Sequence, residues 1–211
     1  MTDLNLLYEA ILKGKQKDAI AYTNEAIADN ISPKELIDNY RIKAMEERGR
    51  RFEAQQVFVP ELLMAGRAMK ASLNILQPLL QIEGNSLSIG KVVIGTVKGD
   101  LHDIGKNLVA SMFEGCGFQV IDVGIDVDSD KFIAAIKEHN ANILGMSALL
   151  TTTMPYMKTV IEALETAGLR EKVKVMIGGA PISAGFAAEI GADAYTDSAN
   201  SAVIRAKELI A

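Results

Sequence analysis

The hydrophobic and polar positions show two different periodic patterns along the chain. In the first third, apolar residues recur every three or four positions, as at Leu4, Leu7 and Ile11, which is the period of an amphipathic helix. A capping box with proline in its second position, Ser32 to Glu35, marks one helix start. The pattern predicts helices over about 4–12, 16–29, 33–52 and 60–80. Short connections between four helices predict a four-helix bundle.

From Lys91 the rhythm changes to apolar, β-branched runs that alternate with helical patterns. We expect strands near 92–97, 118–123, 142–146, 173–177 and 194–196, and helices from about 107, 128, 154, 183 and 199. This alternation predicts an α/β fold, a flavodoxin-like Rossmann domain with a five-stranded parallel sheet in the order 2-1-3-4-5. Residues 81–88 read as a polar linker. We therefore predict a helical domain over 1–84 and a Rossmann-like domain over 85–211.

Chemically distinctive residues follow three of the predicted strands. Asp100 and His102 follow the first strand, Ser147 ends the third, and Gly178-Gly179 follow the fourth. Taken singly, each has a structural explanation, such as a satisfied histidine or a tight turn, and Thr153 suits a helix cap before Met154. In this strand order, however, the carboxyl ends of strands one and three border the usual ligand crevice. Their convergence therefore favours a binding site.

His102 is one of two histidines in the chain, and the other, His139, ends a predicted surface helix. Asp100 lies close enough in sequence to orient one imidazole nitrogen and leave the other free to bind, a common arrangement at metal sites. A tetrahedral zinc site would need more ligands than this. A lone histidine suits a metal whose other positions are filled by a macrocycle, and Gly105 lets the backbone pass close to a bulky group.

Composition and charge exclude several classes of function for this protein. The 211-residue chain has a net charge of −5, no basic block and one cysteine, so we expect no nucleic-acid partner, no membrane partner and no disulfide framework. No apolar run approaches the ~20 residues of a membrane span, and the first residues lack a signal-peptide pattern. We expect a cytoplasmic protein. Nucleotide-binding glycine motifs are absent, and Ser147 stands where a receiver domain needs a phosphorylatable aspartate.

The pattern Asp100-x-His102-x-x-Gly105, followed by Ser147-x-Leu149 and Gly178-Gly179, resembles the cobalamin-binding module of B12-dependent methyltransferases and mutases. Together with the helical domain, nearly the whole chain resembles the small corrinoid proteins of methyltransferase systems and the cap plus cobalamin domains of methionine synthase. The resemblance implies that His102 is the lower axial ligand of cobalt and that Asp100 and Thr153 complete a relay. The residues it implies at the cofactor are Asp100, Leu101, His102, Asp103, Ile104, Gly105, Ser147, Leu149, Thr151, Thr153, Gly178, Gly179 and Ala199.

The same resemblance extends to residues 45–69 of the helical domain. It implies that Phe52 and Val59 cover the upper, reactive face of the corrin. On the residues alone, a hydrophobic staple at a helix start explains this stretch equally well. The sequence also departs from the family here, with Arg48-Gly49-Arg50-Arg51 in place of a frequent Val-Gly pair.

The implied function is that of a methyl carrier, non-catalytic on its own, cycling between Co(I) and methyl-Co(III). Its implied partners are a substrate-specific methyltransferase, a second methyltransferase acting on tetrahydrofolate or a thiol coenzyme, and a corrinoid reductive activator. A cobalamin-dependent sensor is an alternative, although such proteins add a basic DNA-recognition helix. An adenosylcobalamin mutase small subunit is another, although those lack this cap. The sequence does not distinguish methylamine, betaine, methanol or methoxyaromatic donors.

Overall fold

The computed structural model describes residues 3–82 and 89–211. The chain divides into two compact units, Met1–Ile89 with Glu114–Gly117, and Gly90–Phe113 with Phe118–Ala211. Residues 83–88 of the predicted linker lie outside the described residues, and its first two residues end a helix.

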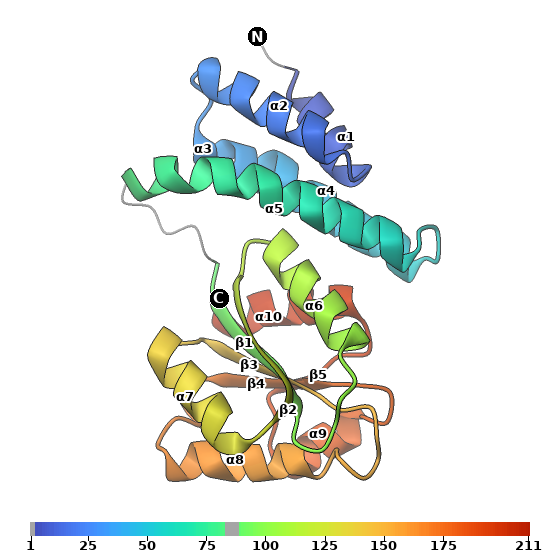
Figure 1. Cartoon of the computed structure of the whole chain (residues 1–211), viewed down its shortest axis with the longest axis vertical. Coiled ribbons are helices and arrows are strands. Elements are labelled where there is room, and N and C mark those ends of the chain that lie inside the picture. Colours follow the sequence, from blue (N-terminus) through green and yellow to red (C-terminus); the bar gives the residue numbers. More distant parts are fainter. Residues whose placement is uncertain (1–2, 83–88) are drawn as a thin grey trace. The chain divides into compact units, whose positions relative to one another are not determined.

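The first unit is a bundle of four helical segments, as predicted (Figure 1). They are α1 (Leu4–Leu12), α2 (Gln16–Ala28), a continuous run of α3 (Pro33–Glu35), η1 (Leu36–Arg41) and α4 (Ile42–Glu53), and α5 (Val59–Ile82). The Ser32 hydroxyl accepts the Glu35 N–H at 3.2 Å, so the predicted start of the third segment is confirmed. The π-helical turn η1 inside that segment was not predicted, because the apolar period continues through it.

The second unit contains one parallel sheet of five strands in the order β2-β1-β3-β4-β5, which confirms the predicted topology. Its strands are β1 (Lys91–Val97), β2 (Gln119–Val127), β3 (Ile143–Ser147), β4 (Lys174–Gly178) and β5 (Ala194–Tyr195). Six of the seven residues of β1 are buried, as expected for a strand covered on both faces. The β1–β3 register pairs Thr96 with Ser147, so the loops after these two strands begin side by side.

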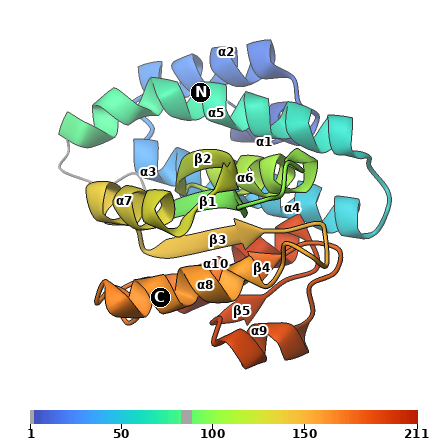
Figure 2. The same ribbon diagram turned by 60° about the horizontal axis from the view of Figure 1, so that its bottom comes forward.

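Helices cover both faces of this sheet (Figures 1 and 2). α7 (Ser129–His139), α8 (Tyr156–Thr166) and α9 (Ala184–Ile190) lie on one face, and α6 (Ile104–Gly115) and α10 (Ala199–Ile210) on the other. The first face buries one continuous core that includes Val93, Leu144 and Val175 from the strands with Phe132 and Ile161 from the helices. Burial of this apolar area is the main stabilising contribution to the unit.

Three predicted boundaries in this unit were wrong. β2 ends at Val127, four residues later than expected, because its pairing with β1 continues through register shifts. α6 begins at Ile104, three residues earlier than expected, because the Asn107 N–H already donates to the Asp103 carbonyl at 2.8 Å. α8 begins at Tyr156 rather than Met154, and its N-cap residue, Pro155, makes no side-chain cap. Thr153 therefore does not cap α8, and its hydroxyl donates to Asp100 and to the carbonyl of Leu150.

Within the described residues, the helices include none that is both long and apolar enough to cross a membrane.

Candidate cofactor-binding site

The site is built on the loop that follows β1. The Asp100 N–H donates to the carbonyl of Val97 at 3.1 Å, which turns the chain directly after the strand. Gly99 completes this turn with a φ of +84°, a conformation that favours glycine. The buried hydroxyl of Thr96 then donates to the carbonyl of His102 at 2.8 Å. The loop is therefore folded back on the end of its own strand.

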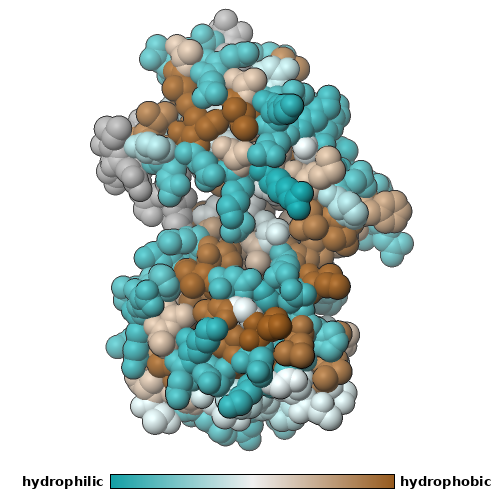
Figure 3. Space-filling view, in the orientation of Figure 1, coloured by the Kyte–Doolittle hydropathy of each residue, from teal (hydrophilic) through white to brown (hydrophobic). Residues whose placement is uncertain are grey.

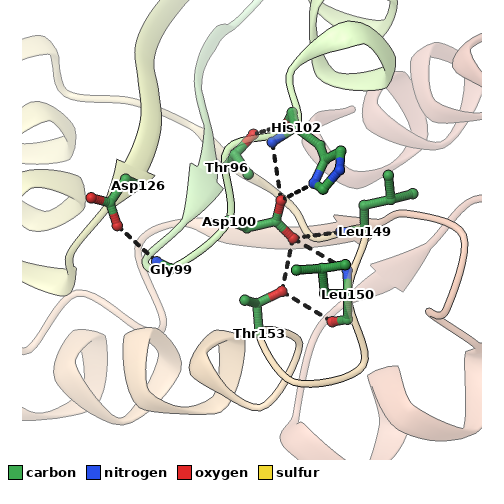
Figure 4. Close-up of polar contacts among 8 residues, drawn as sticks. All are labelled: Thr96, Gly99, Asp100, His102, Asp126, Leu149, Leu150 and Thr153. Carbon is green, nitrogen blue, oxygen red and sulfur yellow. Dashed lines mark hydrogen bonds and ion pairs between the residues drawn. The ribbon is translucent and has the colours of Figure 1, made fainter.

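Asp100 is fully buried and collects donors on both carboxylate oxygens (Figure 4). Its Oδ1 accepts the backbone N–H of His102 at 3.0 Å and lies 2.7 Å from Nδ1 of the same histidine. Its Oδ2 accepts the N–H groups of Leu149 at 2.7 Å and Leu150 at 3.3 Å, and the Thr153 hydroxyl at 2.8 Å. Asp100 therefore joins the loops after β1 and β3.

These contacts decide the charge of Asp100. Burial by itself raises the pKa of this carboxyl, because it disfavours the charged form. The hydrogen bonds from Leu149, His102 and Thr153 outweigh burial and hold the pKa of Asp100 well below its usual range. The group is a carboxylate at neutral pH, so it accepts a hydrogen bond from the Nδ1–H of His102.

This contact leaves Nε2 of His102 as the free ring nitrogen. With the hydrogen on Nδ1, the Nε2 lone pair is available to a metal. The His102 side chain is 51% exposed, and no hydrogen bond to Nε2 occurs within the described part of the chain. The described residues also contain no cluster of three or more His, Cys, Asp or Glu side chains able to hold a metal ion. The donor set therefore fits a metal that brings its other ligands in a macrocycle.

Exposed apolar side chains occur in or next to the two loops that Asp100 joins. Leu101, Ile104 and Leu149 are 67%, 81% and 44% exposed, although each is a large hydrophobic residue. Asp103, which precedes Ile104 in the chain, accepts the Asn107 side-chain amide at 3.0 Å. Exposed large apolar side chains beside polar groups are typical of a surface that a ligand covers.

The predicted site contains glycines that have different structural explanations. A Cβ on Gly179, whose φ is +136°, would collide with the carbonyl oxygen of Ala148, so this glycine is required by the packing of the loops after β3 and β4. A Cβ on Gly105 would meet no atom within 4 Å. Internal packing therefore does not explain Gly105, and the open space beside it suits a bulky ligand.

In the described part of the chain, the remaining predicted site residues do not contact the Asp100–His102 pair through hydrogen bonds. Ser147 and Gly178 pair across β3 and β4 at the carboxyl end of the sheet. Thr151 is exposed in the loop after β3, and Ala199 is buried at the start of α10. Neither Thr151 nor Ala199 hydrogen-bonds to the Asp100–His102 pair among the described residues.

In the helical unit, the two predicted cap residues lie where α4 ends and α5 begins. Phe52 is half-buried and Val59 is 37% exposed, whereas the neighbouring Phe58, which the sequence did not single out, is 73% exposed. Apolar side chains reach the surface near this end of α5 (Figure 3). Oε2 of Glu61 accepts the Phe58 N–H at 2.9 Å, and the buried guanidinium of Arg48 lies 3.8 Å from Oε1.

Comparisons with known proteins find relatives that cover both units. Two family descriptions, both of a B12 binding domain, match residues 4–77 and 90–204. The dimethylamine corrinoid protein of Methanosarcina barkeri is 44% identical over 208 residues, which cover 99% of this chain and 97% of that protein. The trimethylamine corrinoid protein of the same organism is 41% identical over 200 residues, covering 94% and 92%.

Among solved structures, the methanol:cobalamin methyltransferase complex MtaBC from Methanosarcina barkeri superposes with a TM-score of 0.86 at 28% identity, covering 98% of this chain and 79% of that chain. The family descriptions and the relatives thus cover both units, and the structural match covers nearly the whole chain. The chain therefore belongs to the B12-binding corrinoid proteins, with cobalamin or a related corrinoid as its cofactor.

Proposed function

We propose that this protein is the methyl-carrying corrinoid subunit of a methylamine methyltransferase system, with dimethylamine as the methyl donor. The observation that carries the proposal is the geometry at His102, whose Nδ1 is held by a buried carboxylate while Nε2 stays free. The donor is proposed from the 44% identity to the dimethylamine corrinoid protein over 99% of this chain.

In this proposal, the bound corrin supplies a cobalt centre that accepts and releases a methyl group. Nε2 of His102 would bind the cobalt, and the exposed side chains of Leu101, Ile104 and Leu149 would contact the corrin. The open space at Gly105 admits the bulky cofactor. The nucleotide tail passes toward Ser147, Thr151, Gly178, Gly179 and Ala199 at the carboxyl end of the sheet.

Asp100 and Thr153 act on His102 rather than on the ring. Asp100 fixes the tautomer that leaves the Nε2 lone pair free, and it stabilises positive charge on the imidazole. Thr153 has one hydroxyl proton, and Oγ1 lies 2.8 Å from Oδ2 of Asp100 and 3.0 Å from the carbonyl of Leu150. A shift of this proton between the two acceptors adjusts how strongly Asp100 holds the Nδ1 hydrogen. The three residues therefore form the relay.

The helical unit, residues 1–84, is the cap, and residues 85–211 form the cofactor domain. Phe52 and Val59 shield the upper face of the corrin, with Phe58 as a third candidate. Glu61 is the acidic group at this end of α5, and both of its oxygens face partners in the cap, the Phe58 N–H and Arg48. It is not placed as a free acid for activating a C–N bond, which supports a carrier that depends on a separate methyltransferase.

The partners of this carrier act in the cytoplasm. A substrate-specific methyltransferase docks on the cap side, and its support is the likeness to a chain of the methanol:cobalamin methyltransferase complex. A second methyltransferase passes the methyl group to tetrahydrofolate or a thiol coenzyme, and a reductive activator restores the cofactor. Neither nucleic acid nor membrane is a partner, in keeping with a net charge of −5.

The test is methyl transfer in a reconstituted system. The apoprotein is loaded with hydroxocobalamin, reduced anaerobically and mixed with dimethylamine, with and without a dimethylamine methyltransferase. We expect rapid methylation of the cofactor only when that enzyme is present, and much slower methylation when a trimethylamine, monomethylamine or methanol methyltransferase with its own substrate replaces it. Saturable demethylation by the single chain would make it an enzyme in its own right. An adenosyl group on the cofactor of freshly isolated protein would favour a mutase subunit.

A further inference from the structure

A second carboxylate holds the loop of Asp100 and His102 from the opposite side. Oδ1 of Asp126, near the end of β2, accepts the backbone N–H of Gly99 at 2.7 Å (Figure 4). The N–H of Asp126 donates to the carbonyl of Asp100 at 3.1 Å. Two hydrogen bonds in opposite directions therefore join one residue of the edge strand to two consecutive residues of the loop.

The backbone of β2 is bent to place Asp126 there. The β1–β2 register pairs Gly95 with Gly124 and Val97 with Val127, so one residue of β1 faces two residues of β2. This is a β-bulge, which redirects the side chains of the bulged strand. Asp126 lies in the bulge with a φ of +52°, a left-handed conformation that is uncommon outside glycine.

The other flank of the bulge is also fixed. The Lys106 ammonium, whose side chain is only 2% exposed, pairs with Oδ2 of Asp122 on β2. Oδ1 of Asp122 accepts the N–H of Gly124 at 2.9 Å. The bulge is thus held to α6 before Asp126 and to the β1 loop at Asp126. A residue in a sparsely populated conformation persists when its surroundings over-determine it, and such residues cluster at functional sites.

We propose that Asp126 is a positioning residue for the cobalt ligand. It fixes the Lys98–Gly99 and Asp100–Leu101 peptides, which bracket Gly99 and Asp100 in the loop, and Asp100 in turn holds Nδ1 of His102. Asp126 therefore sets the direction in which Nε2 of His102 points, without itself belonging to the relay of Asp100, His102 and Thr153. The inference rests on the proposed role of His102 as axial ligand.

Three substitutions separate the side-chain contact from the backbone conformation. Asp126→Asn keeps an acceptor oxygen and tolerates the left-handed region. Asp126→Gly keeps the conformation but removes the acceptor, and Asp126→Ala loses both. Asn140→Gly is the matched control, because Asn140 is also left-handed, with a φ of +50°, but caps α7.

The measurement is the ratio of histidine-on to histidine-off methylcobalamin bound to each variant. It is read from the visible spectrum against His102→Ala as the histidine-off reference, with thermal unfolding of each apoprotein recorded in parallel. We expect Asp126→Gly to lower the ratio about tenfold at nearly unchanged melting temperature. We expect Asp126→Asn to restore it to within about twofold of wild type, and Asn140→Gly to leave it unchanged.

The outcomes are distinguishable. A wild-type ratio in Asp126→Gly would overturn the positioning role and leave the proposed function intact. An equal fall in Asn140→Gly would also overturn it, because general destabilisation would then explain the loss. If wild-type protein binds methylcobalamin without histidine ligation, the proposed function fails and this inference fails with it. If Asp126→Ala does not fold, the glycine and asparagine variants still decide the question.

Discussion

A hydrogen bond of 2.7 Å joins the backbone N–H of Leu149 to the carboxylate of Asp100, and it connects loops that are 49 residues apart in the chain. The β1–β3 register brings these loops together by pairing Thr96 with Ser147. Asp100 therefore links the positioning of His102 to the closure of the loop after β3. A change at Asp100 is expected to disturb both.

Asp100→Asn tests this double role through stability. The amide offers one oxygen, so either His102 or the N–H groups of Leu149 and Leu150 lose their acceptor. An unsatisfied buried donor costs about 2 kcal/mol, and we expect the free energy of unfolding of the apoprotein to fall by about that amount at pH 7. Denaturant titration measures it. Asp130→Asn, which removes an exposed carboxylate from α7, is the control and is expected to change stability little.

The low pKa of Asp100 also predicts a pH dependence of apoprotein stability. The contacts of the carboxylate depress its folded-state pKa, so the unfolded chain takes up a proton first as the pH falls. The stability from this group is full above the ordinary aspartate pKa of about 4. It decreases as the pH falls from there toward the folded-state value. We expect wild type to lose more stability between pH 6 and pH 3 than Asp100→Asn does, and parallel curves would contradict the charged, hydrogen-bonded state.

His102→Ala removes the proposed axial ligand. We expect the variant to retain corrinoid through the apolar contacts and the nucleotide tail, but with a histidine-off spectrum. The dissociation constant for methylcobalamin should rise by about tenfold or more, because one metal–ligand bond is lost. Visible spectroscopy and equilibrium titration give both quantities. A methylated holoprotein whose spectrum is the same as that of wild type would exclude His102 as the ligand.

Phe58→Ala and Phe52→Ala compare the two aromatic residues at the apolar end of the cap. Phe58 is 73% exposed in the bundle and Phe52 is half-buried. We therefore expect the Phe58 variant to speed photolysis or aerobic oxidation of the methylated holoprotein more than the Phe52 variant, at unchanged cofactor content. Leu6→Ala, which shortens an exposed leucine of α1, controls for general loosening. Wild-type rates in both phenylalanine variants would show that neither shields the upper face.

Arg41→Met probes an uncompensated charge inside the bundle. The Arg41 side chain is fully buried, and its Nε and Nη1 have no hydrogen-bond partner among the residues described. Burial lowers the pKa of its guanidinium to about 9. Its Nη2 donates to the Thr23 hydroxyl at 3.1 Å, and the Thr23–Ser72 contact does not depend on it.

Replacing a buried charge with an apolar side chain of similar length is often neutral or stabilising. We expect Arg41→Met to raise the free energy of unfolding by about 1 kcal/mol, or to leave it unchanged, and denaturant titration measures it. Arg205→Met on the exposed part of α10 is the control. A loss of 3 kcal/mol or more would mean that the guanidinium has a stabilising partner.

Much of the fold was determined by the sequence on its own. Helical period in the first third and strand–helix alternation in the rest were sufficient for the element order, and this alternation favoured the flavodoxin-like strand order 2-1-3-4-5, which the structure has. The same reasoning predicted that Asp100, His102 and Ser147 share the carboxyl edge. The Asp100–His102 contact was foreseeable because the two residues are only two positions apart. Phe58 was not, because the staple pattern at a helix start does not specify which apolar side chain stays exposed.

Only the tertiary structure decided contacts that depend on register across the sheet. The Thr153 hydroxyl suits a helix cap locally, but α8 begins only at Tyr156, and the β1–β3 pairing brings the Asp100 carboxylate within 2.8 Å of this hydroxyl, which donates to it in a charge-assisted hydrogen bond. Asp126 shows the same limit, because its contact with Gly99 exists only through a one-residue bulge between β1 and β2. Such a bulge depends on how two strands pair, so it cannot be predicted from the hydrophobic periodicity of either strand alone.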